Sequence, residues 1–146
     1  MAINPDFSDL YAALNAARAR YLLVGGHAVA FHSQPRFTKD LDVWIEPTPA
    51  NASSVFAALE SFGAPLGSLR VEDLSTEGIV FQIGIPPNRI DILTSIDGVR
   101  FDDAWTARVD TTYGEQPIHV IGREELRRNK LATARPQDLL DAELLK

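Results

Sequence analysis

The segment RFTKDLDVWIEP, residues 36–47, places two acidic residues inside an otherwise apolar strand pattern. Side chains alternate across a β-strand, so Asp40 and Asp42 point to the same face together with Trp44, and the aliphatic residues between them point to the other face. Two carboxylates that point the same way repel each other, and each ionises less readily beside its neighbour. A fold accepts that cost more readily where a cation lies between them. The segment therefore predicts a strand with one buried apolar face and a cation near the other.

Size and composition indicate one globular domain. A chain of 146 residues is long enough for a single core, and 45% hydrophobic with 23% charged residues is typical of soluble proteins. The absence of cysteine excludes disulfides and Cys-ligated zinc. The N-terminal sequence MAINPDFSDL lacks the basic start and apolar run of a signal peptide, and no segment approaches membrane-spanning length. We therefore expect a cytoplasmic protein without a membrane partner.

The charge distribution argues against a general nucleic-acid binder. The net charge is −6, whereas such proteins need a broad basic surface. Basic residues nevertheless gather in REELRRNKLATAR, from Arg123 to Arg135. The ordinary interpretation is a helix whose early acids and later bases suit its dipole. One or two of these bases could still face a phosphate, which leaves room for tRNA.

Hydrophobic spacing and turn residues predict interleaved helices and strands. The expected helices are an amphipathic segment from Phe7 to Ala17, residues 27–31, 49–62 (capped by Thr48 and ended by Gly63), 101–107, 123–132 and 136–145. The expected strands are Tyr21–Val24, Leu41–Ile45, Ile79–Ile85, Arg89–Leu93 and two small strands near Thr111 and His119. Residues 64–78 read as irregular, with room for one short helix. This pattern predicts a compact mixed α/β (α+β) domain over residues 1–146, with a core in 1–121 and C-terminal helices in 122–146.

A third acid lies in RIDIL, where alternation puts Asp91 on one face and two isoleucines on the other. If this strand neighbours the LDVWI strand, Asp91 comes beside Asp40 and Asp42. Three clustered carboxylates form a hard-oxygen site suited to Mg²⁺ or Mn²⁺. The simpler alternatives are a solvated strand edge for the Asp40–Asp42 pair and a salt bridge to Arg89 for Asp91.

Gly25 and Gly26 follow an expected strand and precede an expected helix. Glycine permits close backbone approach, and free N–H groups at a helix start attract phosphate. An isolated glycine pair more commonly marks a structural turn. Its combination with the downstream acids favours a phosphate site.

The stretch VGGHAVAFHSQPRFTKDLDVWI resembles the signature of the DNA polymerase β-like nucleotidyltransferase superfamily: a strand, Gly-Gly or Gly-Ser, a short helix, then Asp-x-Asp. Within it, the chain most resembles small bacterial nucleotidyltransferases related to the AbiEii-type toxin group, whose Arg-x-Thr-x-Asp-hydrophobic-Asp pattern matches Arg36, Thr38, Asp40 and Asp42. The likeness continues through PPNRIDILTSIDGVRFDDAW and NKLATARPQDLLD. It departs at residues 134–136, where Ala-Arg-Pro replaces the Gly-Arg-Pro of that group, so the turn there must form without glycine.

The resemblance implies a nucleotidyltransferase-like mixed sheet flanked by helices. It also implies transfer of an NMP from an NTP to an acceptor hydroxyl, with release of pyrophosphate. Asp40, Asp42 and Asp91 would bind two Mg²⁺ or Mn²⁺ ions that clamp the phosphates during an in-line displacement. Asp91 would also be the general base. Gly25 and Gly26 would approach the triphosphate through their backbone N–H groups.

Three further residues are weaker nucleotide-binding candidates. Arg36 either holds the acids in place or meets a phosphate. Thr38 belongs to the matched pattern, and its hydroxyl also suits a loop turn. Lys130 would be a phosphate ligand, although a surface lysine is the common finding at such a helix position. Trp44 could form a pocket wall or pack in the core, and His27 is expected to pack or bond to backbone.

Two other classes of function remain open. A non-catalytic nucleotide- or metal-binding module, acting as a toxin–antitoxin-type partner or regulator, would suit the short length, because superfamily enzymes usually carry a second domain for the acceptor. A DxD-type sugar-nucleotide enzyme fits the spacing from the glycine pair to the acids poorly. The sequence leaves open the base preference and the acceptor, which could be a small molecule, RNA or protein. It also leaves open whether a homodimer or a partner protein completes the pocket.

Overall fold

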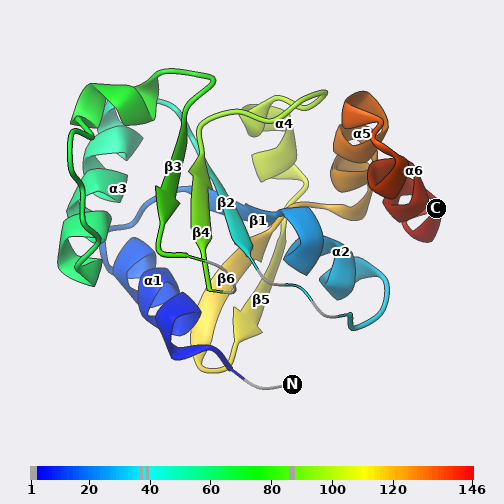
Figure 1. Ribbon diagram of the computed structural model, residues 1–146, viewed down its shortest axis with the longest axis horizontal. Helices are drawn as coiled ribbons and strands as arrows, with labels where there is room; N and C mark the ends of the chain where they lie inside the picture. The colour runs from blue at the N-terminus through cyan, green and yellow to red at the C-terminus, as the bar shows by residue number, and fades with distance from the viewer. Residues whose placement is uncertain (1–2, 37, 39, 86–87) are drawn as a thin grey trace.

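A computed structural model describes residues 3–36, 38, 40–85 and 88–146, and Figure 1 shows its arrangement. The described strands are β1 (Tyr21–Val24), β2 (Leu41–Ile45), β3 (Val80–Ile83), β4 (Ile90–Leu93), β5 (Val109–Tyr113) and β6 (Gln116–Val120). The helices are α1 (Pro5–Ala16), α2 (Gly25–His32), α3 (Pro49–Phe62), α4 (Phe101–Thr106), α5 (Arg123–Thr133) and α6 (Pro136–Leu144), with a 3₁₀ helix η1 (Val71–Ser75). The predicted mixed α/β fold is confirmed.

The strands form one mixed sheet in the order β3-β4-β2-β1-β6-β5. The central pair β1 and β2 is antiparallel, whereas β2 pairs with β4, and β1 with β6, in parallel. The edge strands β3 and β5 are antiparallel to their neighbours. This topology places β4, which carries the third acid, directly beside β2.

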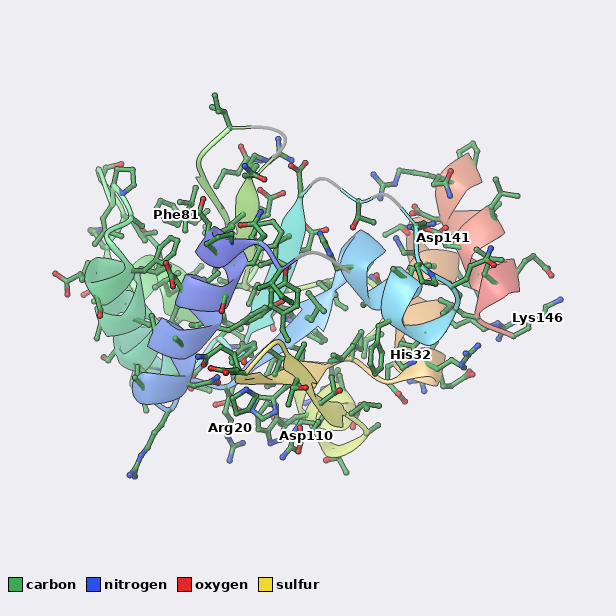
Figure 2. The ribbon with its side chains drawn as sticks, turned by 90° about the horizontal axis from the view of Figure 1, so that it is seen from below. Arg20, His32, Phe81, Asp110, Asp141 and Lys146 are labelled. Carbon is green, nitrogen blue, oxygen red and sulfur yellow. The ribbon has the colours of Figure 1, made fainter. Side chains whose placement is uncertain are left out.

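Helices cover the two faces of the sheet differently. Figures 1 and 2 show α1 and α3 on one face and α2 with the α5–α6 pair on the other. The aliphatic side chains of β2 and β4, including the fully buried Val43 and Ile92, belong to the core with Leu10, Leu14 and Leu59. The opposite face of the same strands carries the acids, so the alternation in LDVWI separates a core face from a polar face.

Local end signals account for the start of α1 and for both ends of α3. The Asn4 side chain accepts hydrogen bonds from the first turn of α1. Thr48 caps α3, which ends at Gly63 with a φ of 90°. The segment 64–78 contains η1, and the predicted PPN turn includes Pro86 and Pro87, which lie outside the described residues. Among the described helices, none has both the length and the apolar character that a membrane span requires.

The turn between α5 and α6 forms without glycine. Ala134 adopts a φ of 54°, in the left-handed region, and its N–H donates to the carbonyl of Lys130 at 3.0 Å. That backbone conformation costs a non-glycine residue about 1–2 kcal/mol. Arg135 is the N-cap residue of α6, and its Nε donates to Asp138 Oδ2 at 2.7 Å. The turn therefore brings α6 back against α5 despite the departure from Gly-Arg-Pro.

Candidate functional site

Strand register brings the three predicted acids together. Asp42 and Asp91 are direct partners on the parallel strands β2 and β4, so their Cα atoms lie about 4.8 Å apart. Asp40 stands immediately before β2 on the same face as Asp42. The sheet thus supplies two carboxylates side by side and a third at the adjacent strand end.

Arg89 lies between two of these carboxylates. Its Nη2 is 3.3 Å from Asp40 Oδ2, and its Nε donates to Asp91 Oδ1 at 2.9 Å. The salt bridge predicted as the simpler alternative for Asp91 is therefore present, together with the acid cluster rather than instead of it. A guanidinium is the cation that offsets part of the repulsion between the acids in this structure.

The Asp42 carboxylate is less well compensated. From the described residues, neither a hydrogen bond nor an ion pair reaches it. Burial raises the pKa of Asp42 to about 6, and the charge of Asp91 adds to that effect, whereas Lys130 opposes it. A carboxyl group of this kind binds a proton or another cation more readily than an exposed aspartate does.

The donor set fits a divalent cation, provided that Arg89 moves. Within the described part of the chain, no three His, Cys, Asp or Glu side chains already surround one metal position. Asp40 Oδ1, however, is a buried oxygen without a hydrogen-bond partner there. Hard carboxylate oxygens are the ligands that Mg²⁺ and Mn²⁺ prefer. Asp40, Asp42 and Asp91 are therefore the residues that would hold such an ion.

The glycine pair is packed directly against these acids. Gly25 has a φ of 69°, and a Cβ atom there would lie 2.1 Å from Asp42 Oδ2. A Cβ on Gly26 would lie 3.0 Å from the Thr38 methyl group and 3.6 Å from Arg36 Nη2. Gly25 is therefore required by its positive φ and by the approach of Asp42, whereas a side chain on Gly26 would press on the Thr38 methyl group. Without side chains at these two positions, the start of α2 is open beside the acids.

Arg36 and Thr38 both lie near this turn, with partners that the sequence did not indicate. Arg36 makes a bidentate ion pair with Asp141 of α6, at 2.7 and 3.3 Å, rather than with the acids of the sheet. The Thr38 hydroxyl lies 3.2 Å from the ring nitrogens of His27. His27 in turn packs edge-on against Phe7, as its predicted structural role requires.

Lys130 is buried, contrary to the usual position of a helix lysine. It is 8% exposed, and its Nζ lies 3.5 Å from both Asp138 Oδ1 and Asp141 Oδ2. Sequence reasoning missed these two acids of α6. The available signal was their spacing of three residues in PQDLLD, which puts both on one helix face directly after a basic helix.

A cavity of about 680 Å³ opens on the acids' side of the sheet, beyond Trp44. Trp44 is both core residue and cavity wall, because it is 2% exposed and packs edge-on against Phe101 with 5.0 Å between ring centroids. The charged lining residues are Glu46, Glu77, Asp102, Asp103, Arg100 and Arg128. Acids thus outnumber bases around the cavity.

Comparisons with known proteins give a structural match only. No protein-family model and no curated protein sequence matches the chain. The lincosamide antibiotic adenylyltransferase LnuA, solved with lincomycin bound, superposes with a TM-score of 0.58 at 16% identity, over 97% of this chain and 95% of LnuA. ANT(2")-Ia, solved in complex with adenylyl-2"-tobramycin, gives 0.62 at 14% identity, over 95% of this chain and 84% of that one. The chain has a nucleotidyltransferase fold.

A third match agrees with this fold. A candidate nucleotidyltransferase from Thermotoga maritima, TM1012, has a TM-score of 0.62 at 14% identity, over 99% of this chain and 92% of the other. Each superposition extends over nearly the whole chain, so the C-terminal helices belong to the shared nucleotidyltransferase fold.

Replacing Gly25 by alanine should destabilise the protein more than the same change at Gly63. Both glycines have positive φ, which costs alanine about 1–2 kcal/mol, but a Cβ on Gly63 meets nothing within 4 Å, whereas one on Gly25 meets Asp42. Urea unfolding of Gly25→Ala and Gly63→Ala measures the difference. Equal losses would mean that Gly25 is only a turn residue.

Stability should depend on pH through Asp42 in metal-free buffer containing EDTA. The pKa of about 6 in the folded state exceeds the ordinary value of 3.8, so the stabilising contribution is complete below pH 4 and is lost as the pH rises through 6. The expected loss is about 1–3 kcal/mol. Asp42→Asn should lack this component, so the difference in unfolding free energy between the variant and wild type should grow between pH 4 and 7. A constant difference would contradict the raised pKa.

Proposed function

We propose that the chain is a metal-dependent nucleotidyltransferase that moves an NMP from an NTP to an acceptor hydroxyl and releases pyrophosphate. The observation that carries this proposal is the direct pairing of Asp42 with Asp91, next to the Gly25 turn, within a nucleotidyltransferase fold. The more specific relation to the AbiEii-type group rests on the Arg36-to-Asp42 sequence pattern alone. An NTP substrate also suits the cytoplasmic location expected from the sequence.

The acids would bind the catalytic ions, two Mg²⁺ or Mn²⁺. When bound, such ions neutralise charge on the phosphates and position the reacting groups. Asp40 and Asp42 hold the ions in this proposal, and Asp91 completes the ligand set. Asp91 is also the proposed general base, because its oxygens are free to accept the hydroxyl proton once Arg89 no longer donates to them.

The triphosphate belongs on the side of the glycine turn. Backbone N–H groups at Gly25 and Gly26 would meet phosphate oxygens, and Arg36 and Lys130 supply positive charge from the same side. Thr38 would contribute less directly, because its methyl group lies 3.0 Å from the position that a Cβ on Gly26 would take. These cations lie on the α6 side of the acids, whereas the cavity at Trp44 lies along β2.

The acceptor belongs in that cavity. Trp44 is two residues beyond Asp42 on the same strand face, a displacement of about 6.6 Å. The predominance of carboxylates in the lining disfavours a triphosphate there. A small molecule also agrees better than tRNA with the basic helix α5, because three of its four bases are paired with acids. These pairs are Arg127 with Glu124, Arg128 with Glu125, and Lys130 with Asp138 of α6.

A second candidate is the non-catalytic nucleotide- or metal-binding module. The observation in its favour is the ion pairing of Arg89 with Asp40 and Asp91, which satisfies part of the acid cluster without a metal ion. Its other support, the short length, is weaker, because this chain covers 95% of LnuA, which is named as an adenylyltransferase.

Activity is tested with the purified chain, Mg²⁺, each of the four NTPs and a panel of hydroxyl acceptors, with pyrophosphate release as the readout. We expect acceptor-dependent release that falls at least about a thousandfold in Asp42→Asn and Asp91→Asn, because each removes a ligand from the proposed ion site. Asp9→Asn, an exposed acid on α1, is the matched control and should retain activity. Absence of both turnover and metal-dependent NTP binding in wild type would refute the proposal.

Arg89→Gln should bind Mn²⁺ about tenfold more tightly than wild type, because the guanidinium competes with the ion for Asp40 and Asp91. Titration followed by electron paramagnetic resonance measures free Mn²⁺ directly. Arg70→Gln removes the same charge from an exposed residue and should leave the affinity unchanged. Weaker binding by Arg89→Gln would mean that Arg89 organises the acids rather than competing for them.

A further inference from the structure

The inner face of α6 carries the two most deeply buried acids of the described chain. Asp138 is 2% exposed and Asp141 is 1% exposed, and they lie three residues apart on one helix face. Buried carboxylates are costly unless cations and hydrogen bonds compensate for the lost water. Their partners should therefore explain why α6 retains them.

The partners of Asp141 come from distant parts of the chain. Both Nη groups of Arg36 donate hydrogen bonds to the Asp141 carboxylate. The side-chain amide of Gln137 donates to Asp141 Oδ1 at 2.9 Å. Burial alone would raise the pKa of Asp141, but the hydrogen bonds from Arg36 and Gln137 hold that pKa below its usual value. Figure 2 shows Asp141 on the side of α6 that faces α2. Asp141 is therefore an ionised carboxylate that holds an arginine of the loop before β2.

The held cations lie beside the proposed phosphate site. Arg36 Nη2 is the cationic atom nearest to the Cβ position of Gly26, at 3.6 Å, and Lys130 is close enough to Asp42 to lower its pKa. Asp138 and Asp141 share Lys130 at equal distance. Arg36, Lys130 and Arg135 together outnumber the two acids by one charge, so the cluster presents net positive charge to its surroundings.

The pairing of Asp141 with Arg36 is not needed to join α5 to α6. Lys130 with Asp138 already links the two helices, and buried Ala142 and Leu145 add apolar contacts. Asp141 instead reaches a residue 105 positions away in sequence and fixes both nitrogens of its guanidinium fork. Bidentate pairing defines the orientation of an arginine more narrowly than a single contact does.

We propose that Asp141 is a positioning residue for the NTP: it holds the Arg36 guanidinium at the glycine turn, in place to meet the triphosphate, and shares Lys130 with Asp138 on the same side. The inference rests on the proposed nucleotidyltransferase function and adds a role for α6 in it. Asp141 itself does not touch the nucleotide. Its effect is to reduce the freedom that Arg36 would lose on binding phosphate.

The test is Mg²⁺-dependent ATP binding by Asp141→Asn, measured by isothermal titration calorimetry beside the wild type. The substitution makes the net charge of −6 less negative by one, which on its own would strengthen binding of an anion. The proposal requires the opposite sign: binding about tenfold weaker, because Arg36 loses the carboxylate that orients it. Equal or tighter binding would overturn the role of Asp141.

Glu143→Gln is the matched control. Glu143 lies on the same helix, is exposed and pairs only with Lys146 among the described residues. This variant makes the same change in net charge and should not weaken ATP binding. Loss of affinity in both variants would assign the effect to a general change in α6.

Two further measurements separate positioning from stability. Inorganic tripolyphosphate, which has no base or ribose, should lose the same factor of affinity in Asp141→Asn as ATP does. The loss in the double variant with Arg36→Gln should be less than the sum of the single losses, since Asp141 acts through Arg36. Fully additive losses would contradict the proposal.

If Asp141→Asn does not fold, Arg36→Lys carries the test. Lysine keeps the charge but not the fork that binds Asp141, so ATP binding should again weaken about tenfold. Wild-type affinity in that variant would overturn the proposal. If the wild-type chain binds neither ATP nor tripolyphosphate, the proposed function itself is wrong. If the wild type binds ATP and Asp141→Asn binds it equally well, only the positioning role of Asp141 is wrong.

Discussion

Repulsion between carboxylates on neighbouring strands is the constraint on which the rest of the site depends. The parallel register of β2 and β4 places Asp42 directly beside Asp91, and a sheet backbone cannot relax to separate them. Two cations offset part of this repulsion. Arg89, the residue before β4, pairs with Asp91, and Lys130 of α5 lowers the pKa of Asp42. Asp42 still ionises with difficulty, so the site retains an affinity for further positive charge.

The two sides of the acid cluster differ in charge and in construction. On one side, the open start of α2 lies beside Arg36 and Lys130, both held by carboxylates of α6. On the other side, a cavity beyond Trp44 is lined mainly by acids. In the proposed reaction, the carboxylates of the cavity would repel a polyanionic donor from it and leave the cavity to the acceptor.

Much of this arrangement follows from local sequence signals. Alternation in LDVWI and RIDIL, the Gly25 turn and the caps of α3 predicted the elements and the shared face of the acids, since each signal acts within a few residues. The pairing of Arg36 with Asp141 could not be predicted, because nothing local relates residues 105 positions apart. For the same reason, Lys130 read as a surface lysine: its burial depends on α6 folding back at Ala134, where the expected glycine is missing.

The span of the pair between Arg36 and Asp141 has a consequence for biosynthesis. The ribosome makes the glycine bend and Arg36 long before it makes α6, and it completes the last strand, β6, before α6 begins. A nascent chain that has all its strands but not yet α6 therefore has an unrestrained Arg36. In such an intermediate, the acid cluster forms before α6 can hold Arg36 and Lys130 beside it. Under the proposed function, only the fully folded chain would bind the nucleotide tightly. The ligand would therefore stabilise the complete fold over this intermediate.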